Sequence, residues 1–541
     1  MDKKIVFPKN KIEVSVGDGE TLLDAIRRAG LPIEAVCSGR GTCGKCRVRV
    51  NGAERLACET TAADGMIVEI LSSSGEQEIL TGSGVMKNAL PPSGKTAIAI
   101  DIGTTTVVVK ALDTGSGKEI CIRAFANPQR IYGADVLSRI NSAIDDASTL
   151  SGLIRAAVDQ AVQDILCDDV YLEYREKYSR EDQKKYSCEK IVIAGNTTMM
   201  YLLLNLRCRS LGLVPFEPEY TPGLAYSYSE IFGKETLSCP VLIYPFISAF
   251  VGGDIVSGLV NIERHLESGE APSYMLVDMG TNGEIAFRNG ERLITTSTAA
   301  GPALEGGNIS CGMSSLPGAI YESAYEGNGD FSYKTIGGRP AAGICGSGVI
   351  SLMATLIQAG LVSESGAFTD TGDSLAESSE QGPAYKGFVI AEAGADGGER
   401  IVFTQKDVRE VQLAKGAIRA GIDILMEEMG ETPRTLYLAG GFGQNINLES
   451  SILVGLIPEG LAGRIRLAGN TALGGCADAC MEAGPAAGPD ANTGANTTTD
   501  PDASLPSLSI ISAAEEINLG SHKDFNDKFM ETMMFEQAVD G

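Results

Sequence analysis

Four of the chain's 13 cysteines lie close together near the N-terminus. Three form a C-x5-C-x2-C run and eleven residues separate the third from the fourth: Cys37, Cys43, Cys46 and Cys58. The two irons of a [2Fe–2S] cluster need four terminal thiolates, and the glycines of this run let backbone N–H groups approach the sulfides. Structural zinc is the alternative, but zinc sites usually carry two matched C-x2-C pairs. The spacing therefore predicts that these four cysteines bind a [2Fe–2S] cluster.

Residues 1–70 contain the elements that must position this cysteine loop. Two expected strands, KIVF and KIEVSV, precede a helix capped by Thr21, and the strands KCRVRVNG and MIVEIL follow the loop. This order resembles that of β-grasp ferredoxins. The interval before Cys58 is shorter than in plant-type ferredoxins, so a tight hairpin is expected at NGAE (51–54). Residues 71–95, rich in Ser, Gly and Pro, are expected to be a linker.

Two later segments share a pattern suited to phosphate binding. DIGTTT (101–106) and DMGTNG (278–283) each lie between two apolar strands. Rossmann and P-loop sites instead enter a helix after their glycine turn, so a hairpin turn would have to hold the phosphate here. Glycine lets N–H groups approach the phosphate and threonine adds hydroxyl donors. The predicted phosphate contacts are Gly103, Thr104, Thr105, Gly280, Thr281 and Asn282. Asp101 and Asp278 are predicted catalytic carboxylates that hold Mg²⁺ directly or through water.

A third glycine element, LAGGFGQN (438–445), ends another expected strand. A flat adenine and its ribose could lie against the backbone of Gly440, Gly441 and Gly443. With the two hairpins, this element resembles the phosphate and adenosine motifs of the acetate kinase, sugar kinase, Hsp70 and actin superfamily. The resemblance implies two ribonuclease-H-like lobes that close over ATP. Either hairpin alone could be an ordinary tight turn, but two strand-flanked copies and the later glycine element together favour nucleotide binding.

Three more segments allow two interpretations each. AGNTT (194–198) and GICGSG (343–348) each open an expected helix and could receive a phosphate at its N-terminus. Helix capping and close packing explain them equally well. VGGD (251–254) could place Asp254 near the metal as a third carboxylate, or could use it as an N-cap.

Length, composition and charge indicate the number of domains, the classes of partner and the expected location. A chain of 541 residues, 43% hydrophobic and with 65 glycines, is typical of a loop-rich α/β protein of two or three domains. The net charge of −26 and the pI of 4.6 argue against nucleic acid and anionic membranes as partners. The sequence contains no apolar run of 18 residues and no signal-peptide pattern, so a cytoplasmic location is expected.

The predicted fold class is α/β (α+β), with a β-grasp ferredoxin domain followed by a two-lobed, ribonuclease-H-like ATPase of the actin/Hsp70 type. Alternating strands, glycine turns and helices assign residues 96–482 to the ATPase domain. A low-complexity insert, expected to be disordered, follows at 483–506. Residues 507–541 are expected to complete the domain with a strand, IISAAEEINLG, and a helix, DFNDKFMETMMF.

The combination of the two domains resembles the reductive activators of corrinoid proteins. The stretches that carry the resemblance are CSGRGTCGKCRVRV, ERLACET, AIDIGTTTVVV, IYGADVLSRI, VIAGNTTMMYLLL, LVDMGTNGEI, TAAGPALEGGNISCGM, GICGSGVISL and LAGGFGQNIN. The resemblance implies ATP-driven transfer of one electron from the [2Fe–2S] cluster to cobalt(II), which restores cobalt(I). It also implies Mg²⁺ as a cofactor, and a corrinoid methyl-transfer protein and a low-potential electron donor as partners. Whether the chain forms a homodimer is left open.

Three other functions remain open at this point. A small-molecule kinase with a regulatory cluster would need an acceptor pocket and a phosphorylated product. An activator of a radical dehydratase would place a [4Fe–4S] cluster between two subunits rather than in an appended ferredoxin domain. A nucleotide-switched binding protein would use the cluster only as a sensor. Nucleotide chemistry alone does not separate them, because a fold does not fix a function.

Overall fold

The computed structural model describes most of the chain: residues 3–9, 11–17, 19–29, 31, 33, 46–71, 92–133, 135–178, 188–220, 225–266, 271–327, 330–369, 375–378, 385–394, 400–443, 446–482 and 507–535. The chain divides into two compact units, residues 1–79 with 91–243 and residues 80–90 with 244–541. Most of the expected linker and the whole low-complexity insert lie outside the described residues.

The N-terminal part of the first unit has the expected order of strands and helix. Thr21 caps helix α1 by accepting a hydrogen bond from the Asp24 N–H, as predicted. The expected tight hairpin is confirmed, since Val50 pairs with Ala53 across a turn in which Asn51 and Gly52 both have positive φ. The elements are β1 (Lys3–Phe7), β2 (Ile12–Val16), α1 (Leu22–Arg28), β3 (Arg47–Val50), β4 (Ala53–Leu56) and β5 (Val68–Ile70).

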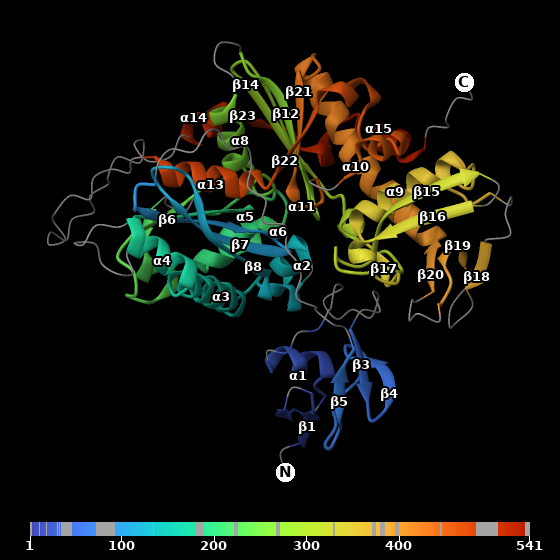
Figure 1. Cartoon of the computed structure of the whole chain (residues 1–541), viewed down its shortest axis with the longest axis horizontal. Coiled ribbons are helices and arrows are strands. Elements are labelled where there is room, and N and C mark those ends of the chain that lie inside the picture. The colour runs from blue at the N-terminus through green and yellow to red at the C-terminus, as the bar shows by residue number, and fades with distance from the viewer. Residues whose placement is uncertain are drawn as a thin grey trace. The chain divides into compact units, whose positions relative to one another are not determined.

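The rest of the first unit is built on a six-stranded sheet with the order β10-β11-β9-β6-β7-β8. Figure 1 labels β6, β7 and β8 of this sheet. Its strands are β6 (Thr96–Ile102), β7 (Thr106–Asp113), β8 (Glu119–Ala126), β9 (Ile191–Gly195), β10 (Ala225–Ser227) and β11 (Pro240–Ile243). Its helices are η1 (Pro128–Ile131), α2 (Val136–Ser142), α3 (Ser148–Leu166), α4 (Asp169–Tyr178), α5 (Thr197–Leu204), α6 (Arg209–Gly212) and α7 (Tyr228–Phe232).

The second unit contains another six-stranded sheet, with the order β22-β21-β12-β13-β14-β23 (Figure 1). Its strands are β12 (Ser273–Met279), β13 (Gly283–Asn289), β14 (Arg292–Thr298), β21 (Thr435–Ala439), β22 (Ile465–Gly469) and β23 (Ala514–Glu516). Two three-stranded sheets comprise β15 (Ala319–Gly327), β16 (Asp330–Thr335) and β17 (Gly343–Ile344), and β18 (Leu375–Ser378), β19 (Tyr385–Ala391) and β20 (Ile401–Thr404). The helices are α8 (Gly253–His265), η2 (Pro302–Glu305), η3 (Ile336–Gly338), α9 (Gly346–Gln358), α10 (Gln405–Met429), α11 (Gly440–Gly443), α12 (Leu448–Leu453), η4 (Glu459–Arg464), α13 (Thr471–Met481), α14 (Ser507–Ala513), η6 (Leu519–Ser521) and α15 (Phe525–Met533).

The two six-stranded sheets follow one plan. In each, a first strand forms a hairpin with the next strand and pairs in parallel with a later one: β6 with β7 and β9, β12 with β13 and β21. The registers also correspond, because Asp101 lies opposite Ala194 and Asp278 lies opposite Ala439. AGNTT in the first unit therefore occupies the place that LAGGFGQN occupies in the second. This duplication confirms the predicted two ribonuclease-H-like lobes.

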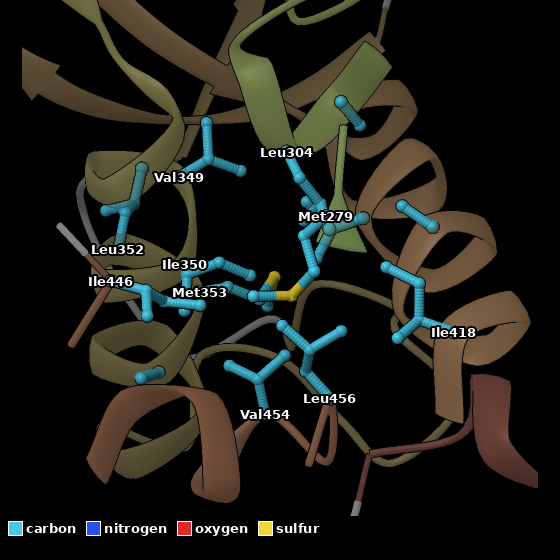
Figure 2. Packing of buried hydrophobic residues seen from close by; sticks show 14 of the residues in the cluster. Met279, Leu304, Val349, Ile350, Leu352, Met353, Ile418, Ile446, Val454 and Leu456 are labelled. Atoms are coloured by element: carbon cyan, nitrogen blue, oxygen red, sulfur yellow. The ribbon is translucent and has the colours of Figure 1, made fainter. Parts of the chain in front are cut away.

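A buried apolar cluster anchors the end of β12. Met279, the residue after Asp278, is 1% exposed and lies in the core of the second unit. Figure 2 shows its side chain and that of Leu304 among residues of α9, α10 and the segment after α12, including Met353, Ile418 and Leu456. Because successive side chains of a strand point to opposite faces, burial of Met279 directs Asp278 away from this cluster.

The C-terminal segment differs from the expectation. Residues 507–513 form helix α14, and the strand expected over 510–520 is limited to β23, which pairs in parallel with three residues of β14. Ile510, 2% exposed, is buried as part of the helix instead of pairing in the sheet. Packing has therefore overridden the β-branched composition of the segment.

Asp113, the last residue of β7, binds the segment that leads into β6 of the first six-stranded sheet. Its carboxylate is fully buried and accepts hydrogen bonds from the backbone and hydroxyl groups of Ser93 and Ser116, the Gly94 N–H and the Tyr174 hydroxyl. Burial alone would raise the pKa of Asp113, but the hydrogen bonds from Tyr174, Ser116 and Ser93 outweigh it and lower this pKa to about 2.

We expect Asp113→Asn to lower the free energy of unfolding by about 2 kcal/mol at neutral pH. A lowered carboxyl pKa stabilises the folded chain above the unfolded pKa, so the difference from wild type should shrink as pH falls from about 4 towards 2. Urea unfolding followed by circular dichroism measures it. Asp164→Asn, on the exposed face of α3, is the control, and equal unfolding midpoints for the two variants would refute the role of Asp113.

Candidate nucleotide site and cluster ligands

The first hairpin turn, between β6 and β7, is tight. The Gly103 N–H donates to the Thr106 carbonyl at 2.9 Å, and a Cβ on Gly103 would lie 2.7 Å from that oxygen. Thr105 is exposed, while Asp101 and Thr104 are half-buried. The Thr104 hydroxyl accepts a hydrogen bond from the Asn196 amide at 2.9 Å. The predicted phosphate contacts of this turn therefore lie together at one end of β6.

Two residues that the sequence analysis did not assign support this turn. The Asn127 amide donates to the Gly103 carbonyl at 2.9 Å, and the Arg139 guanidinium donates to the Thr104 carbonyl. Arg139 lies within the stretch IYGADVLSRI, which carried the family resemblance but had no role. No sequence signal connects it with Thr104, because 35 positions separate the two residues.

The second hairpin turn, between β12 and β13, has acidic surroundings. Asp278 and Glu284 are direct cross-strand partners. Burial, together with the negative charges of Asp254 and Asp278, raises the pKa of Glu284 well above its ordinary value. The Thr281 hydroxyl donates to the Glu305 carboxylate at 3.2 Å, and the Gly280 N–H donates to the Asn282 carbonyl at 3.0 Å.

A divalent cation would interact favourably with these carboxylates and would offset the repulsion that disfavours the charged form of Glu284. Like charges directly opposite each other in a sheet are destabilising. Mg²⁺ is usually bound through one or two carboxylates together with phosphates and water. Among the described residues, no three His, Cys, Asp or Glu side chains converge closely enough to hold a metal by themselves. The side chains of the second hairpin thus fit a metal that arrives with phosphate rather than a closed protein site.

The adenosine element packs directly against the second hairpin. Gly440 follows β21 with a φ of +87°, and a Cβ there would lie 2.6 Å from the Asp278 carboxylate and 2.7 Å from the Met279 carbonyl. Only glycine fits this approach without displacing Asp278. Gly441 is exposed and has space around it, and Gly443 ends α11. Gln444 and Asn445 lie outside the described residues.

The sequence allowed two interpretations for each of the segments AGNTT, GICGSG and VGGD, and the structure shows the contacts that each one makes. Asn196 is the N-cap of α5, and its amide contacts Thr104, so AGNTT combines capping with support of the first hairpin. In GICGSG the observed role is close packing, since a Cβ on Gly348 would lie 2.0 Å from the Ile320 carbonyl. Asp254 is not an N-cap, because Gly252 holds that position in α8. It acts electrostatically on Glu284.

Two of the four predicted cluster ligands lie in the described residues. The Cys46 and Cys58 sulfurs are 3.3 Å apart, and the Ala57 N–H donates to the Cys46 carbonyl at 2.8 Å. Two thiolates on one tetrahedral metal, with bonds of about 2.3 Å, stand about 3.8 Å apart. The pair therefore fits two ligands of the same metal. Cys37 and Cys43 lie outside the described residues.

Comparison with known families matches three consecutive parts of the chain. Residues 6–65 match a 2Fe-2S iron–sulfur cluster binding domain, 96–267 the RACo middle region, and 273–540 the C-terminal domain of RACo, the ASKHA domain. The chain belongs to the RACo family of reductive activators of corrinoid proteins. The matches confirm the [2Fe–2S] interpretation over zinc, and they confirm ATP with Mg²⁺ as ligands of the ASKHA domain.

Individual proteins support this assignment over most of the chain. The corrinoid activation enzyme RamQ of Eubacterium limosum is 29% identical, with 87% of this chain and 91% of RamQ aligned. The [Co(II) methylated amine-specific corrinoid protein] reductase of Methanosarcina barkeri is 27% identical over 70% of this RACo-family chain and 68% of the reductase. The structure of a reductive activator for corrinoid,iron-sulfur protein is 25% identical, with a TM-score of 0.64 over 99% of this chain and 98% of that one. No helix in the described parts of this RACo-family chain is both long and apolar enough to cross a membrane.

We expect Gly440→Ala to lower kcat/KM for ATP hydrolysis about tenfold, because the alanine must adopt a positive φ and push Asp278 aside. The visible absorption of the cluster should not change, since the substitution leaves the cysteine ligands intact. Steady-state ATPase assays measure the effect.

Gly460→Ala in η4 is the matched control, because no heavy atom lies within 4 Å of a Cβ at that position. Equal ATPase parameters for the two variants would contradict the close approach of the adenosine element to Asp278.

Proposed function

We propose that this protein uses ATP binding and hydrolysis to transfer one electron from its [2Fe–2S] domain to cobalt(II) of a corrinoid methyl-transfer protein, which restores cobalt(I). The observation that carries the proposal is the presence of a [2Fe–2S] domain, a RACo middle region and an ASKHA domain in one chain. The relatives whose names describe corrinoid activation or cobalt reduction align over most of this chain, which supports the same activity here.

The energetics explain why an electron carrier would need an ATPase. Cobalt(I) is reached only at very low potential, whereas a plant-type [2Fe–2S] centre lies at about −400 mV. A shortfall of about 100 mV for one electron corresponds to roughly 2.3 kcal/mol. Nucleotides that bind two conformations with different affinities can offset a cost of this size. The protein then needs no phosphoryl acceptor, unlike a small-molecule kinase.

The roles of the residues follow from the two hairpins and the cysteine loop. Asp101 and Asp278 hold Mg²⁺ directly or through water, and the Asp254 carboxylate adds its negative charge to that of Asp278 around Glu284. The phosphate contacts are Gly103, Thr104, Thr105, Gly280, Thr281 and Asn282, and the adenosine contacts are Gly440, Gly441 and Gly443. The cluster, which supplies one electron when bound, has Cys37, Cys43, Cys46 and Cys58 as its ligands.

The proposed domains are a ferredoxin domain at 1–70, a linker at 71–95, an ATPase domain at 96–482 with an insert at 483–506, and a C-terminal completion at 507–541. A low-potential donor reduces the cluster, and the cytosol is the proposed location. The described cysteines form no disulfide with one another, which suits a reducing compartment.

Two substitutions should separate the two halves of the reaction. We expect Cys58→Ser to abolish cobalt(I) formation and weaken the visible absorption of the cluster, while ATP affinity stays unchanged. We expect Asp278→Asn to leave this absorption intact but to lower ATP turnover and cobalt(I) formation about a hundredfold, because the metal loses a ligand. Anaerobic assays with a cobalt(II) corrinoid protein, a reductant and ATP measure both quantities.

Cys167→Ser, which removes an exposed thiol, is the control for loss of a cysteine. Cobalt(I) formation that survives in Cys58→Ser would refute electron transfer through the cluster. ATP turnover without cobalt reduction by the wild type, across several corrinoid proteins, would favour a kinase or a redox-sensing switch.

A further inference from the structure

Arg139 is a fully buried arginine beneath the first hairpin. The residue is 0% exposed, although it lies on the short helix α2. Its Nε donates to the Gly133 carbonyl at 2.9 Å, its Nη1 lies 3.3 Å from the Met199 sulfur, and its Nη2 donates to the Thr104 carbonyl. All three nitrogens of the guanidinium are therefore directed at fixed partners, one of which belongs to the phosphate-binding turn.

The positive charge of Arg139 has no ion-pair partner among the described residues. The nearest acidic influence is Asp135, whose carboxylate caps α2 by accepting a hydrogen bond from the Ser138 N–H at 2.7 Å. Burial lowers the pKa of the Arg139 guanidinium to about 9, Asp135 opposes this shift, and the positive charge of Arg130 adds to it. A buried, uncompensated cation costs free energy. An anion that binds nearby offsets part of this cost, because it is attracted to the buried positive charge.

The hydrogen bonds around Arg139 also fix which atoms the turn presents. The Gly103 carbonyl accepts from Asn127 and the Thr104 carbonyl accepts from Arg139. The Asn127 N–H donates in turn to the Thr105 carbonyl at 2.8 Å. Three consecutive carbonyl oxygens are thus held by donors from the protein. Carbonyl oxygens repel phosphate oxygens, so this arrangement favours an anion at the turn. The Gly103 N–H itself donates to the Thr106 carbonyl, which leaves Thr104 and Thr105 as the donors for that anion.

The second hairpin has the opposite electrostatic surroundings. Asp278 lies directly across from Glu284 in the β12–β13 pair. The Thr281 hydroxyl donates to another acid, Glu305. Each hairpin carries one aspartate, Asp101 or Asp278, but the first also rests on a buried cation and the second has Glu284 and Glu305 as further carboxylates. Anionic phosphate fits the first, and a divalent cation fits the second.

We propose that Arg139 is a positioning residue of the nucleotide site, which holds the Thr104 carbonyl inward and makes the first hairpin electropositive for the phosphates of ATP, while the second hairpin mainly holds the metal. This inference rests on the proposed function, since it assumes that ATP binds at the hairpins. It adds a residue outside both hairpin motifs. It also assigns phosphate binding to the first hairpin and metal binding mainly to the second.

The test measures binding of ATP, ADP and AMP, with Mg²⁺ present, to the full cluster-containing chain by calorimetry. Arg139→Lys keeps the charge but cannot make the same three contacts, so it should weaken ATP binding about tenfold. Arg139→Met should weaken it further, in the order ATP, then ADP, then AMP. A purely structural role would lower the melting temperature without this dependence on the number of phosphates.

The control is Arg175→Lys in α4. Arg175 is also buried and donates to the Gly94 carbonyl at 3.2 Å, so this variant should lose stability but keep wild-type affinities. If Arg139→Met does not fold, Arg139→Lys decides alone. Affinities of Arg139→Lys within twofold of wild type for all three nucleotides, or an equal loss for all three, would overturn the inference. Wild-type protein that binds no ATP would instead refute the proposed function itself.

Discussion

The carbonyl oxygens of the first hairpin turn are held by donors from other segments, and the chain path of much of the first unit depends on these hydrogen bonds. Gly103 and Thr104 would otherwise present acceptors to an anion. Asn127, just before η1, and Arg139, on α2, occupy those acceptors, and Asn196 at the start of α5 contacts the Thr104 hydroxyl. The segments that follow β8 and β9 are thereby tied to the end of β6. The same hydrogen bonds therefore fix the local chain path and shape the predicted phosphate site.

The second unit repeats the same strand plan around a different ligand chemistry. The apolar cluster around Met279 fixes the end of β12, and the close approach of Gly440 fixes the adenosine element against Asp278. Burial and the negative charges of Asp254 and Asp278 raise the pKa of Glu284 beside this hairpin. Duplicated backbone geometry with different side chains thus gives one unit suited to phosphate and one suited to a cation. The appended [2Fe–2S] domain gives this nucleotide machinery an electron to deliver.

The sequence predicted the parts of the site that are local in the chain. The cysteine spacing, both hairpins, the later glycine element and the cap at Thr21 are patterns of a few neighbouring residues, and the family resemblance rested on such patterns. Glu284 could have been found from the register alone, since a three-residue turn at 280–282 places it opposite Asp278. Local patterns were therefore sufficient to predict the fold class and to propose most residues of the candidate site.

Contacts between distant segments could not be predicted in this way. Arg139 reaches Thr104 only after α2 folds against the end of β6, and nothing in the stretch IYGADVLSRI indicates that its arginine is buried. The predicted C-terminal strand is present as β23 but is shorter than expected, for a related reason. The first residues of the predicted strand lie in α14, where Ile510 is buried, and only 514–516 pair with β14.

The central claim is that ATP drives an electron from the cluster to cobalt. The most direct measurement is a single turnover under anaerobic conditions: the pre-reduced protein is mixed with a cobalt(II) corrinoid protein, with or without MgATP, while the cluster and cobalt(I) absorptions are followed together. The account predicts that the cluster is oxidised and cobalt(I) appears at equal rates, and only when MgATP is present. Equal cobalt(I) formation without ATP, or ATP hydrolysis while the cluster stays reduced, would contradict it.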